Sequence, residues 1–141
     1  DCLLSRGLGD VYKRQYLDMA EKIYNFIFNN PNLPEDLVPY WDFDAPNIPN
    51  EPRDASAAAC TASALYELST YIPGKNYKET ADKIMENLGS PAYRAEVGTN
   101  GNFILMHSVG SIPHGAEIDV PLNYADYYFL EGIMRKRDLE K

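Results

Sequence analysis

The sequence predicts an all-α protein that is part of a larger helical toroid. Four stretches carry apolar residues at helical spacing, and a strand signal is found only at residues 93–106, as a small β-hairpin. Each predicted helix has a broad apolar face, and the 141 residues hold few elements to cover those faces. We therefore expect a fragment of a helical ring rather than a complete bundle.

Residues 1–15 do not match the sequence that follows them. They lack an initiating methionine, a sustained helical period and a capping signal, and they are too polar and too often interrupted by glycine for a signal peptide. They look like translated adapter sequence joined to a truncated gene. We expect residues 1–15 to be a non-native leader and residues 16–141 to be the C-terminal part of a single helical-toroid domain.

The first helix is predicted over residues 16–28. Its apolar stripe is wide, which indicates a helix that is buried on more than one side; the stripe consists of Tyr16, Ala20, Ile23 and Ile27, with Met19 and Phe26 beside it. The sequence Asn29-Asn30-Pro31 ends the helix, because proline cannot continue the hydrogen-bond ladder.

A long loop with six prolines follows, from Pro31 to Pro52. Loops of this length are uncommon and often functional. At its centre three aromatic residues, Tyr40, Trp41 and Phe43, are interleaved with Asp42 and Asp44. The three rings could form a wall on which a sugar stacks, with the two carboxylates as acceptors for its hydroxyls. We favour the alternative that Trp41 and Phe43 plug a helix bundle while the aspartates cap turns, since aromatic anchors often pin long loops.

The second helix is predicted from Arg53 to Leu68. Asp54 is a suitable N-cap, and the alanine- and serine-rich turns after it let neighbouring helices approach closely, as in an inner helix. Arg53 could meet an anionic ligand, although such an arginine more often pairs with a nearby acid, for example Asp42 or Asp44.

The third helix is predicted to end at Leu88, before Gly89-Ser90-Pro91. A cap at Asn76, with Glu79 three residues later, starts it, and Tyr77, Ala81, Ile84 and Leu88 form its apolar stripe. After it, the Asn100-Gly101 turn signal suits a hairpin that pairs residues 103–106 with residues 93–97.

The last third of the chain is a polar loop that leads into an aromatic helix. Gly110, Pro113, Gly115 and Pro121 interrupt regular structure up to residue 121. The helix is predicted over residues 122–137, with Pro121 at its start and with tyrosines at helical spacing. A polar loop on a stiff helix can present side chains to a ligand, and an ordinary surface loop is the alternative.

Composition excludes several classes of partner. The net charge is −8 and the pI about 4.7, which disfavours nucleic acid and anionic membranes as partners. No apolar run approaches ~18 residues, the length of a membrane span. Two cysteines, Cys2 and Cys60, and two histidines form no recognisable metal site, so we expect neither a metal nor a cofactor.

Two long motifs resemble the unsaturated glucuronyl hydrolases, family 88 of the glycoside hydrolases. The first is Tyr40-Trp-Asp-Phe-Asp44 followed by Arg53-Asp-Ala-Ser-Ala57. The second is His107-Ser-Val-Gly-Ser-Ile-Pro-His114 followed by Asn123-Tyr-Ala-Asp126-Tyr-Tyr-Phe-Leu-Glu131. The resemblance extends from Tyr16 to Asp138 and implies the C-terminal part of an (α/α)6 toroid of six helical hairpins.

The resemblance also implies a chemistry and a substrate. The substrate is a lyase-generated oligosaccharide with a 4,5-unsaturated uronic acid at its non-reducing end, which is an enol ether. Protonation of C4 and addition of water at C5 give a hemiketal that collapses and releases the next sugar. A carboxyl group that donates the proton and orients the water is needed, and the two-carboxylate displacement of ordinary glycosidases does not apply.

The family's two catalytic aspartates lie in its N-terminal half, so no catalytic residue is assigned within this chain. The resemblance implies that Ser111 and His114 bind substrate, because the family places substrate-contacting hydroxyls at these positions. His114 replaces a serine, and Ala116 stands where sulfate-preferring members carry a lysine, which puts a preference for sulfated substrates in doubt. Two alternatives remain: an unsaturated rhamnogalacturonyl hydrolase that acts on pectin fragments, and a non-catalytic helical binding module.

Overall fold

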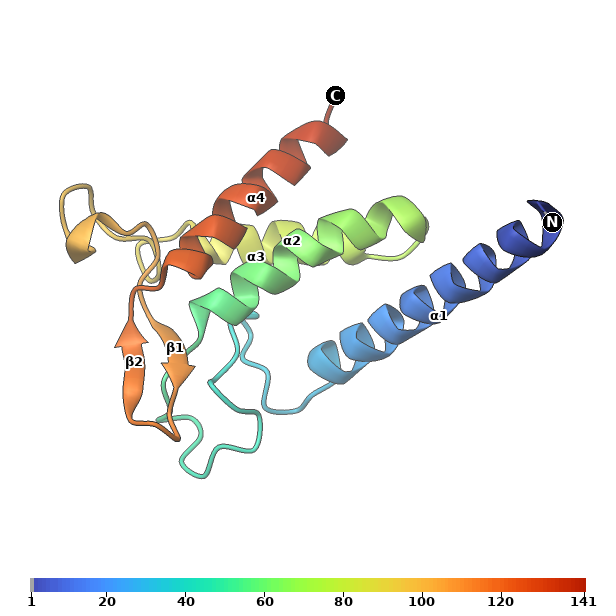
Figure 1. The fold of residues 1–141 in the computed structure, drawn as a ribbon. Coiled ribbons are helices and arrows are strands. Elements are labelled where there is room, and N and C mark those ends of the chain that lie inside the picture. Colours follow the sequence, from blue (N-terminus) through green and yellow to red (C-terminus); the bar gives the residue numbers. More distant parts are fainter. Residues whose placement is uncertain (1) are drawn as a thin grey trace. The chain divides into compact units, whose positions relative to one another are not determined.

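The computed structural model describes residues 2–141, which form four α-helices, a 3₁₀ turn and a two-stranded sheet (Figure 1). The chain divides into two compact units, one up to Pro31 and one from Asn32 onward. The elements are α1 (Cys2–Phe28), α2 (Ala55–Tyr71), α3 (Tyr77–Leu88), η1 (Asn100–Asn102), β1 (Ser108–Ser111), β2 (Ala116–Val120) and α4 (Asn123–Leu139). Among these residues, no helix combines the length and the apolar character of a membrane span.

Helix α1 makes up most of the first unit. It ends at Phe28 as predicted but begins at Cys2 rather than near Tyr16. The extension is physically reasonable, since residues 2–28 contain no proline and an interior glycine costs a helix only about 1 kcal/mol. That residues 1–15 are a non-native leader remains a prediction.

Most of the apolar stripe of α1 is exposed in this chain, while Ala20 and Ile27 are half-buried, so the expectation of a helix buried on several sides is not met. The exposed fractions are 75% for Tyr16, 53% for Met19 and Ile23, and 64% for Phe26. Because the first unit contains this helix alone, it holds no second element that could cover the stripe.

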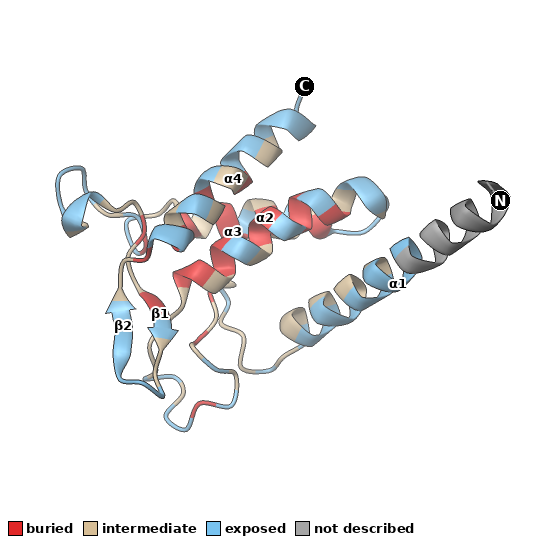
Figure 2. Cartoon of the chain, in the orientation of Figure 1, coloured by how far each residue is buried: buried red, intermediate tan, exposed pale blue. Residues whose placement is uncertain are grey.

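The core of the second unit lies around α2, which packs against both α3 and α4. Figure 2 shows buried residues concentrated on α2 and α3. The small residues Ala55, Ala58, Ala59 and Ala62 are almost completely buried. Gly132 brings α4 close, since a Cβ added there would lie 4.0 Å from the backbone nitrogen of Ser63. The prediction of an inner helix is confirmed.

The predicted cap of α2 is confirmed, whereas that of α3 is wrong. Asp54 accepts hydrogen bonds from the backbone of Ser56 and Ala57 at 3.0 and 3.3 Å. Asn76 makes no side-chain cap, because its backbone (φ −79°, ψ 32°) is not the extended conformation that a capping residue adopts. The hydroxyl of Thr80 donates instead to the Asn76 carbonyl at 2.6 Å. The predicted apolar stripe of α3 is buried throughout.

The sheet lies at residues 108–120, not at the predicted hairpin of residues 93–106. In the predicted segment Arg94 and Leu105 form an isolated antiparallel bridge, flanked by backbone hydrogen bonds from Ala95 to the Ile104 carbonyl at 2.9 Å and from Met106 to the Tyr93 carbonyl at 2.8 Å, with η1 at the predicted turn. The predicted pairing is therefore present, but it does not extend into a sheet. The carboxylate of Asp126 accepts the backbone N–H groups of Ile104 and Leu105 at 2.8 and 2.9 Å. These groups therefore bond to a side chain of α4 rather than to a neighbouring strand.

Strands β1 and β2 pair antiparallel and convert the expected polar loop into a hairpin. Ser108 faces Val120 and Ser111 faces Ala116, with an irregular register between Ser108 and Val109. Gly110 fits within the strand because the side chain of Glu117 occupies the space where a Cβ would lie. Pro121 precedes the N-cap of α4, Leu122, so it lies just outside the helix that it was expected to begin.

Candidate functional site

The tip of the β1–β2 hairpin brings Ser111 and His114 together. The Oγ atom of Ser111 lies 2.6 Å from Nδ1 of His114, which is hydrogen-bonding distance. The turn between them is closed by a hydrogen bond from Gly115 N–H to the Ile112 carbonyl at 2.9 Å. Ser111 is half-buried and His114 is exposed. The two residues that the sequence singled out therefore form one hydrogen-bonded pair at an accessible turn.

The hairpin is fixed to the N-terminus of α2. The N–H of Ala55, the first residue of that helix, donates to the His107 carbonyl at 2.9 Å. The cap residue Asp54 also accepts the Val109 N–H at 3.4 Å. Ser108, which lies between His107 and Val109 in the sequence, is completely buried. The base of the hairpin is thus held by the same carboxylate that caps the helix, so the tip projects from a rigid support.

His107 and Asp119 form a second pair on this hairpin. Their Nδ1 and Oδ1 atoms are 2.6 Å apart, and the Tyr93 ring lies edge-on to the imidazole at a centroid distance of 6.2 Å. Sequence reasoning did not assign a role to either residue. The sequence did contain a hint of this pair. Pro113 and Gly115 mark a turn, and His107 and Asp119 lie on either side of that turn, where the two arms of a hairpin would bring them together.

Glu117 and Tyr124 add polar groups beside the hairpin. A Cβ at Gly110 would lie 2.0 Å from Oε2 of Glu117, so the Glu117 carboxylate lies against the backbone next to Ser111. Tyr124 lies in the first turn of α4. Burial, followed by the charges of Glu117 and Asp54, raises the pKa of Tyr124.

Arg53 is not a free cation that could meet an anionic ligand. Its guanidinium pairs with Asp36 rather than with Asp42 or Asp44, and its Nε donates to the Val38 carbonyl at 2.9 Å. The group also lies 5.1 Å from the centroid of the Tyr40 ring. The expectation that Arg53 pairs with an acid is correct, but the acid is one that the sequence did not suggest.

The Trp41–Asp44 segment makes contacts that stabilise its own loop. The indole N–H of Trp41 donates to Glu51 at 2.9 Å, and Asp42 accepts the Asp44 N–H at 2.7 Å. Asp42 therefore caps a turn, as the favoured interpretation predicted. Trp41 and Phe43 are half-buried.

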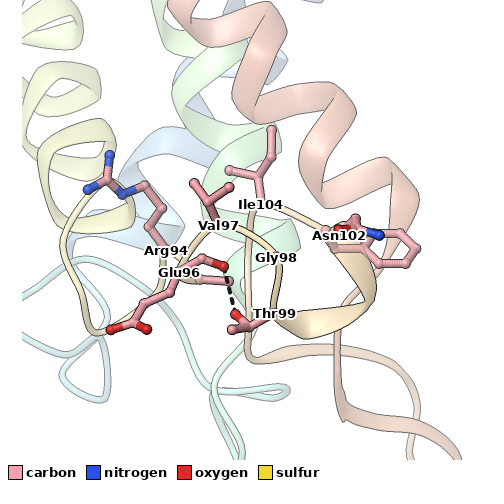
Figure 3. Close-up of a pocket in the computed structure, with 9 residues that line it drawn as sticks. Arg94, Glu96, Val97, Gly98, Thr99, Asn102 and Ile104 are labelled. Carbon is pink, nitrogen blue, oxygen red and sulfur yellow. Dashed lines mark hydrogen bonds between the residues drawn. The ribbon is translucent and has the colours of Figure 1, made fainter.

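A separate pocket of about 450 Å³ lies beside η1 and is lined by residues 94–99 and 102–104 (Figure 3). The Thr99 hydroxyl donates to the Glu96 carbonyl at 2.7 Å and closes a turn at its edge. Ser111 and His114 do not line this pocket. Among residues 13–141, whose side chains the structure describes, no group of three or more histidine, cysteine, aspartate or glutamate residues is placed to hold a metal ion.

Comparison with characterised proteins identifies relatives of one kind, although no family model matches the chain. The chain is 50% identical over 125 residues to an unsaturated glucuronyl hydrolase of Formosa agariphila, covering 89% of this chain and 31% of that protein. It is 31% identical over 138 residues to an unsaturated glucuronyl hydrolase of Bacillus sp. GL1, covering 94% and 35%. The chain thus spans about a third of the length of the curated relatives that it matches.

Solved structures agree with this match. A crystal structure of an unsaturated glucuronyl hydrolase specific for heparin has a TM-score of 0.87 and 48% identity, over 90% of this chain and 34% of that chain. A Streptococcus agalactiae enzyme variant complexed with dGlcA-GalNAc6S has a TM-score of 0.69 and 30% identity, over 79% and 31%. The predicted fold class, mainly helical and part of a six-hairpin toroid, is confirmed.

Proposed function

Because this chain belongs to the unsaturated glucuronyl hydrolase family, we propose that it is the C-terminal part of an enzyme that removes 4,5-unsaturated uronic acid from lyase-generated oligosaccharides. The reaction is hydration of the enol ether: C4 takes a proton, water adds at C5, and the hemiketal collapses to release the next sugar. The observation that carries the proposal is the agreement of the fold and the sequence with a solved enzyme of this family over 90% of the chain.

Within this enzyme the β1–β2 hairpin serves as a substrate-binding element. Its tip presents the Ser111–His114 pair, a hydroxyl and an imidazole that can each donate or accept a hydrogen bond. Sugar hydroxyls and carboxylates need such donors, particularly on a chain whose net charge of −8 repels an anionic substrate at long range. The proton-donating aspartate is supplied by the part of the enzyme that precedes these residues.

The substrate class is a glycosaminoglycan fragment, and the heparin type is favoured. The solved structure with 48% identity is a heparin-specific enzyme, whereas the relatives named unsaturated chondroitin disaccharide hydrolases are 28–29% identical to this chain. We therefore expect this enzyme to share the substrate preference of the relative with the higher sequence identity, provided that the hairpin makes the same contacts with the substrate in both proteins.

The test is a spectroscopic assay of the full-length enzyme. Hydration removes the conjugated double bond, so the ultraviolet absorbance of the uronate falls as the reaction proceeds. Unsaturated disaccharides from heparin, chondroitin and rhamnogalacturonan are compared at equal concentration. We expect the heparin disaccharide to react fastest. Preference for the rhamnogalacturonan disaccharide would indicate the pectin-directed alternative, and binding without loss of absorbance would indicate a non-catalytic module.

A further inference from the structure

The two arms of the β1–β2 hairpin are held unequally. Strand β1 is fixed at its base, where the Ala55 N–H donates to the His107 carbonyl at 2.9 Å and Asp54 accepts the Val109 N–H at 3.4 Å. Strand β2, in contrast, is exposed over its first four residues (Figure 2). The position of β2, and of the turn that it carries, therefore depends on the contacts that tie it to β1.

A bulge in β2 turns the side chain of Asp119 toward one such contact. The residues of β2 on either side of Asp119 pair with consecutive residues of β1, so Asp119 is the extra residue that the ladder passes over. Bulges of this kind re-aim a side chain. Here the Oδ1 atom of Asp119 lies 2.6 Å from Nδ1 of His107, at the start of the opposite arm.

Both members of this pair have a left-handed backbone conformation. The φ angle is 64° at His107 and 54° at Asp119. Histidine and aspartate tolerate this region better than most residues, but glycine adopts it without strain and is the usual residue at a bulge of this type. The two side chains are 43% and 56% exposed, and such an exposed pair contributes less to stability than backbone strain of this kind costs. Stability alone would therefore favour glycine at position 119.

His107 connects the pair to the body of the protein. The Tyr93 ring lies edge-on to the imidazole, with a centroid distance of 6.2 Å and an angle of 84° between the ring planes. The Tyr93 hydroxyl in turn donates to Asp36 at 2.7 Å. The imidazole thus lies between a ring that is fixed by the proline-rich loop and the carboxylate of the exposed strand.

We propose that His107 and Asp119 are positioning residues, whose hydrogen bond ties β2 to the fixed arm and so sets the place of the hairpin tip. Neither residue has to touch the sugar. The proposal rests on the proposed function of the hairpin, and it accounts for a strained aspartate at a place where glycine would be more stable.

The test replaces Asp119 by glycine in the full-length enzyme, which removes the carboxylate and leaves the bulge without strain. We expect the Tm to stay the same or to rise, while amide hydrogen exchange of residues 111–117 becomes about fivefold faster. KM for an unsaturated disaccharide should rise about fivefold and kcat should change less than about twofold, because the tip is less well placed and the chemistry is intact. A role in stability alone would instead lower the Tm.

Two further variants make the test specific. Asp119→Asn keeps an acceptor for the imidazole and tolerates the left-handed conformation, so it should keep the wild-type exchange and KM. Asn102→Gly makes the same backbone change at an exposed residue of η1 with φ 69°, and it should alter neither quantity.

The outcomes separate this inference from the proposed function. Unchanged exchange in Asp119→Gly, a lower Tm, or faster exchange with an unchanged KM would each overturn the positioning role. A wild-type enzyme that removes the uronate from no unsaturated disaccharide would overturn the proposed function, whereas the exchange measurement would still report whether the pair holds the hairpin tip.

Discussion

The guanidinium of Arg53 is held by the carboxylate of Asp36, which lies 17 residues earlier in the chain. The same carboxylate accepts the Tyr93 hydroxyl at 2.7 Å and the Val38 N–H at 3.1 Å, and the Asp36 carbonyl accepts Asn87 at 2.7 Å. Asp36 thus joins the proline-rich loop to the start of α2 and to the segment after α3. Burial, together with the bond to Asp36, raises the pKa of Tyr93, which stays protonated.

Asp36→Ala should lower the free energy of unfolding of the full-length protein by about 2 kcal/mol, because Arg53 and Tyr93 lose a half-buried partner. Urea denaturation followed by circular dichroism measures the change. Asp44→Ala, at an exposed position of the same loop, is the matched control and should shift stability by no more than about 0.5 kcal/mol. Equal effects of both changes would show that Asp36 is not the junction described above.

Asp82 should give the protein an acid-sensitive component of stability. Burial acts to raise its pKa, but hydrogen bonds from Lys78, Lys136 and Tyr66 outweigh burial and lower the pKa to about 2. The pKa in an unfolded chain is about 3.9. A carboxylate whose pKa is lowered on folding stabilises the folded protein at pH values above the pKa of the unfolded chain. This stabilisation is lost as the pH falls from about 4 to about 2.

Asp82→Asn should therefore destabilise the protein by about 1–2 kcal/mol at pH 7, a range reduced for the partial exposure of the side chain. The difference from the wild type should disappear near pH 2. Denaturation curves at pH 7, 4 and 2 measure it, with Glu86→Gln on the exposed side of α3 as the control. A difference that persists unchanged at pH 2 would contradict an ionic origin.

Gly110→Ala should distort the hairpin. The new Cβ would lie 2.0 Å from Oε2 and 2.8 Å from Cβ of Glu117, and the second contact cannot be relieved by rotating the side chain alone. We expect KM of the full-length enzyme to rise about tenfold, with a smaller change in kcat, because the tip is displaced rather than the chemistry. Adding Glu117→Gly to the Gly110→Ala variant removes both clashing atoms and should bring KM most of the way back to the wild-type value. If KM stays high in the double variant, the clash with Glu117 is not the cause of the weaker binding.

Ser111→Ala in the full-length enzyme should raise KM by more than it changes stability. The side chain is half-buried at the turn and its hydroxyl contacts His114 rather than the core, so we expect a KM increase of about fivefold to tenfold, as for one lost hydrogen bond to a ligand. Steady-state kinetics and a thermal melt on the same sample measure both quantities. Unchanged KM and kcat would remove Ser111 from the site.

The 141-residue chain on its own should be inactive and should self-associate. On α4 the exposed fractions are 59% for Tyr127, 49% for Leu130, 45% for Ile133 and 48% for Met134, an apolar surface that favours association. Sedimentation velocity measures the association, and the loss of uronate absorbance measures activity. Leu130→Lys combined with Met134→Glu should shift the chain toward monomer. A monomeric wild-type chain with cooperative unfolding would contradict this prediction.

Helical periodicity was sufficient to predict most of the fold. The stripe of α3 and the small residues of α2 follow local rules, since period and size act within one helix. The hairpin predicted at residues 93–106 forms only one bridge because long-range contacts decide its extent: Asp126 takes the N–H groups of Ile104 and Leu105 in the segment that looked like a strand. Positive φ angles at His107, Glu117 and Asp119 are likewise rare for such residues and cannot be inferred from composition.

For the candidate site, the sequence indicated Ser111 and His114 but not how they are arranged. That they share one hydrogen bond depends on the turn closed by Gly115 and Ile112, a geometry that residue spacing does not fix. The partner of Arg53 was unpredictable for a similar reason, because the proline-rich loop folds back and brings Asp36 closer than Asp42 or Asp44.

The double role of Asp54 constrains how the hairpin can move. One carboxylate caps α2 and also accepts the Val109 N–H, and the Ala55 N–H donates to the His107 carbonyl, so the strand cannot swing away without losing both of its hydrogen bonds to the start of the helix. A hairpin that closed over a ligand would have to bend at residues 107–109, and these residues are hydrogen-bonded to the start of α2. In the proposed enzyme a sugar would therefore meet the tip of the hairpin in the position that folding gives it, and adjustment to the sugar would fall to the side chains beyond Gly110.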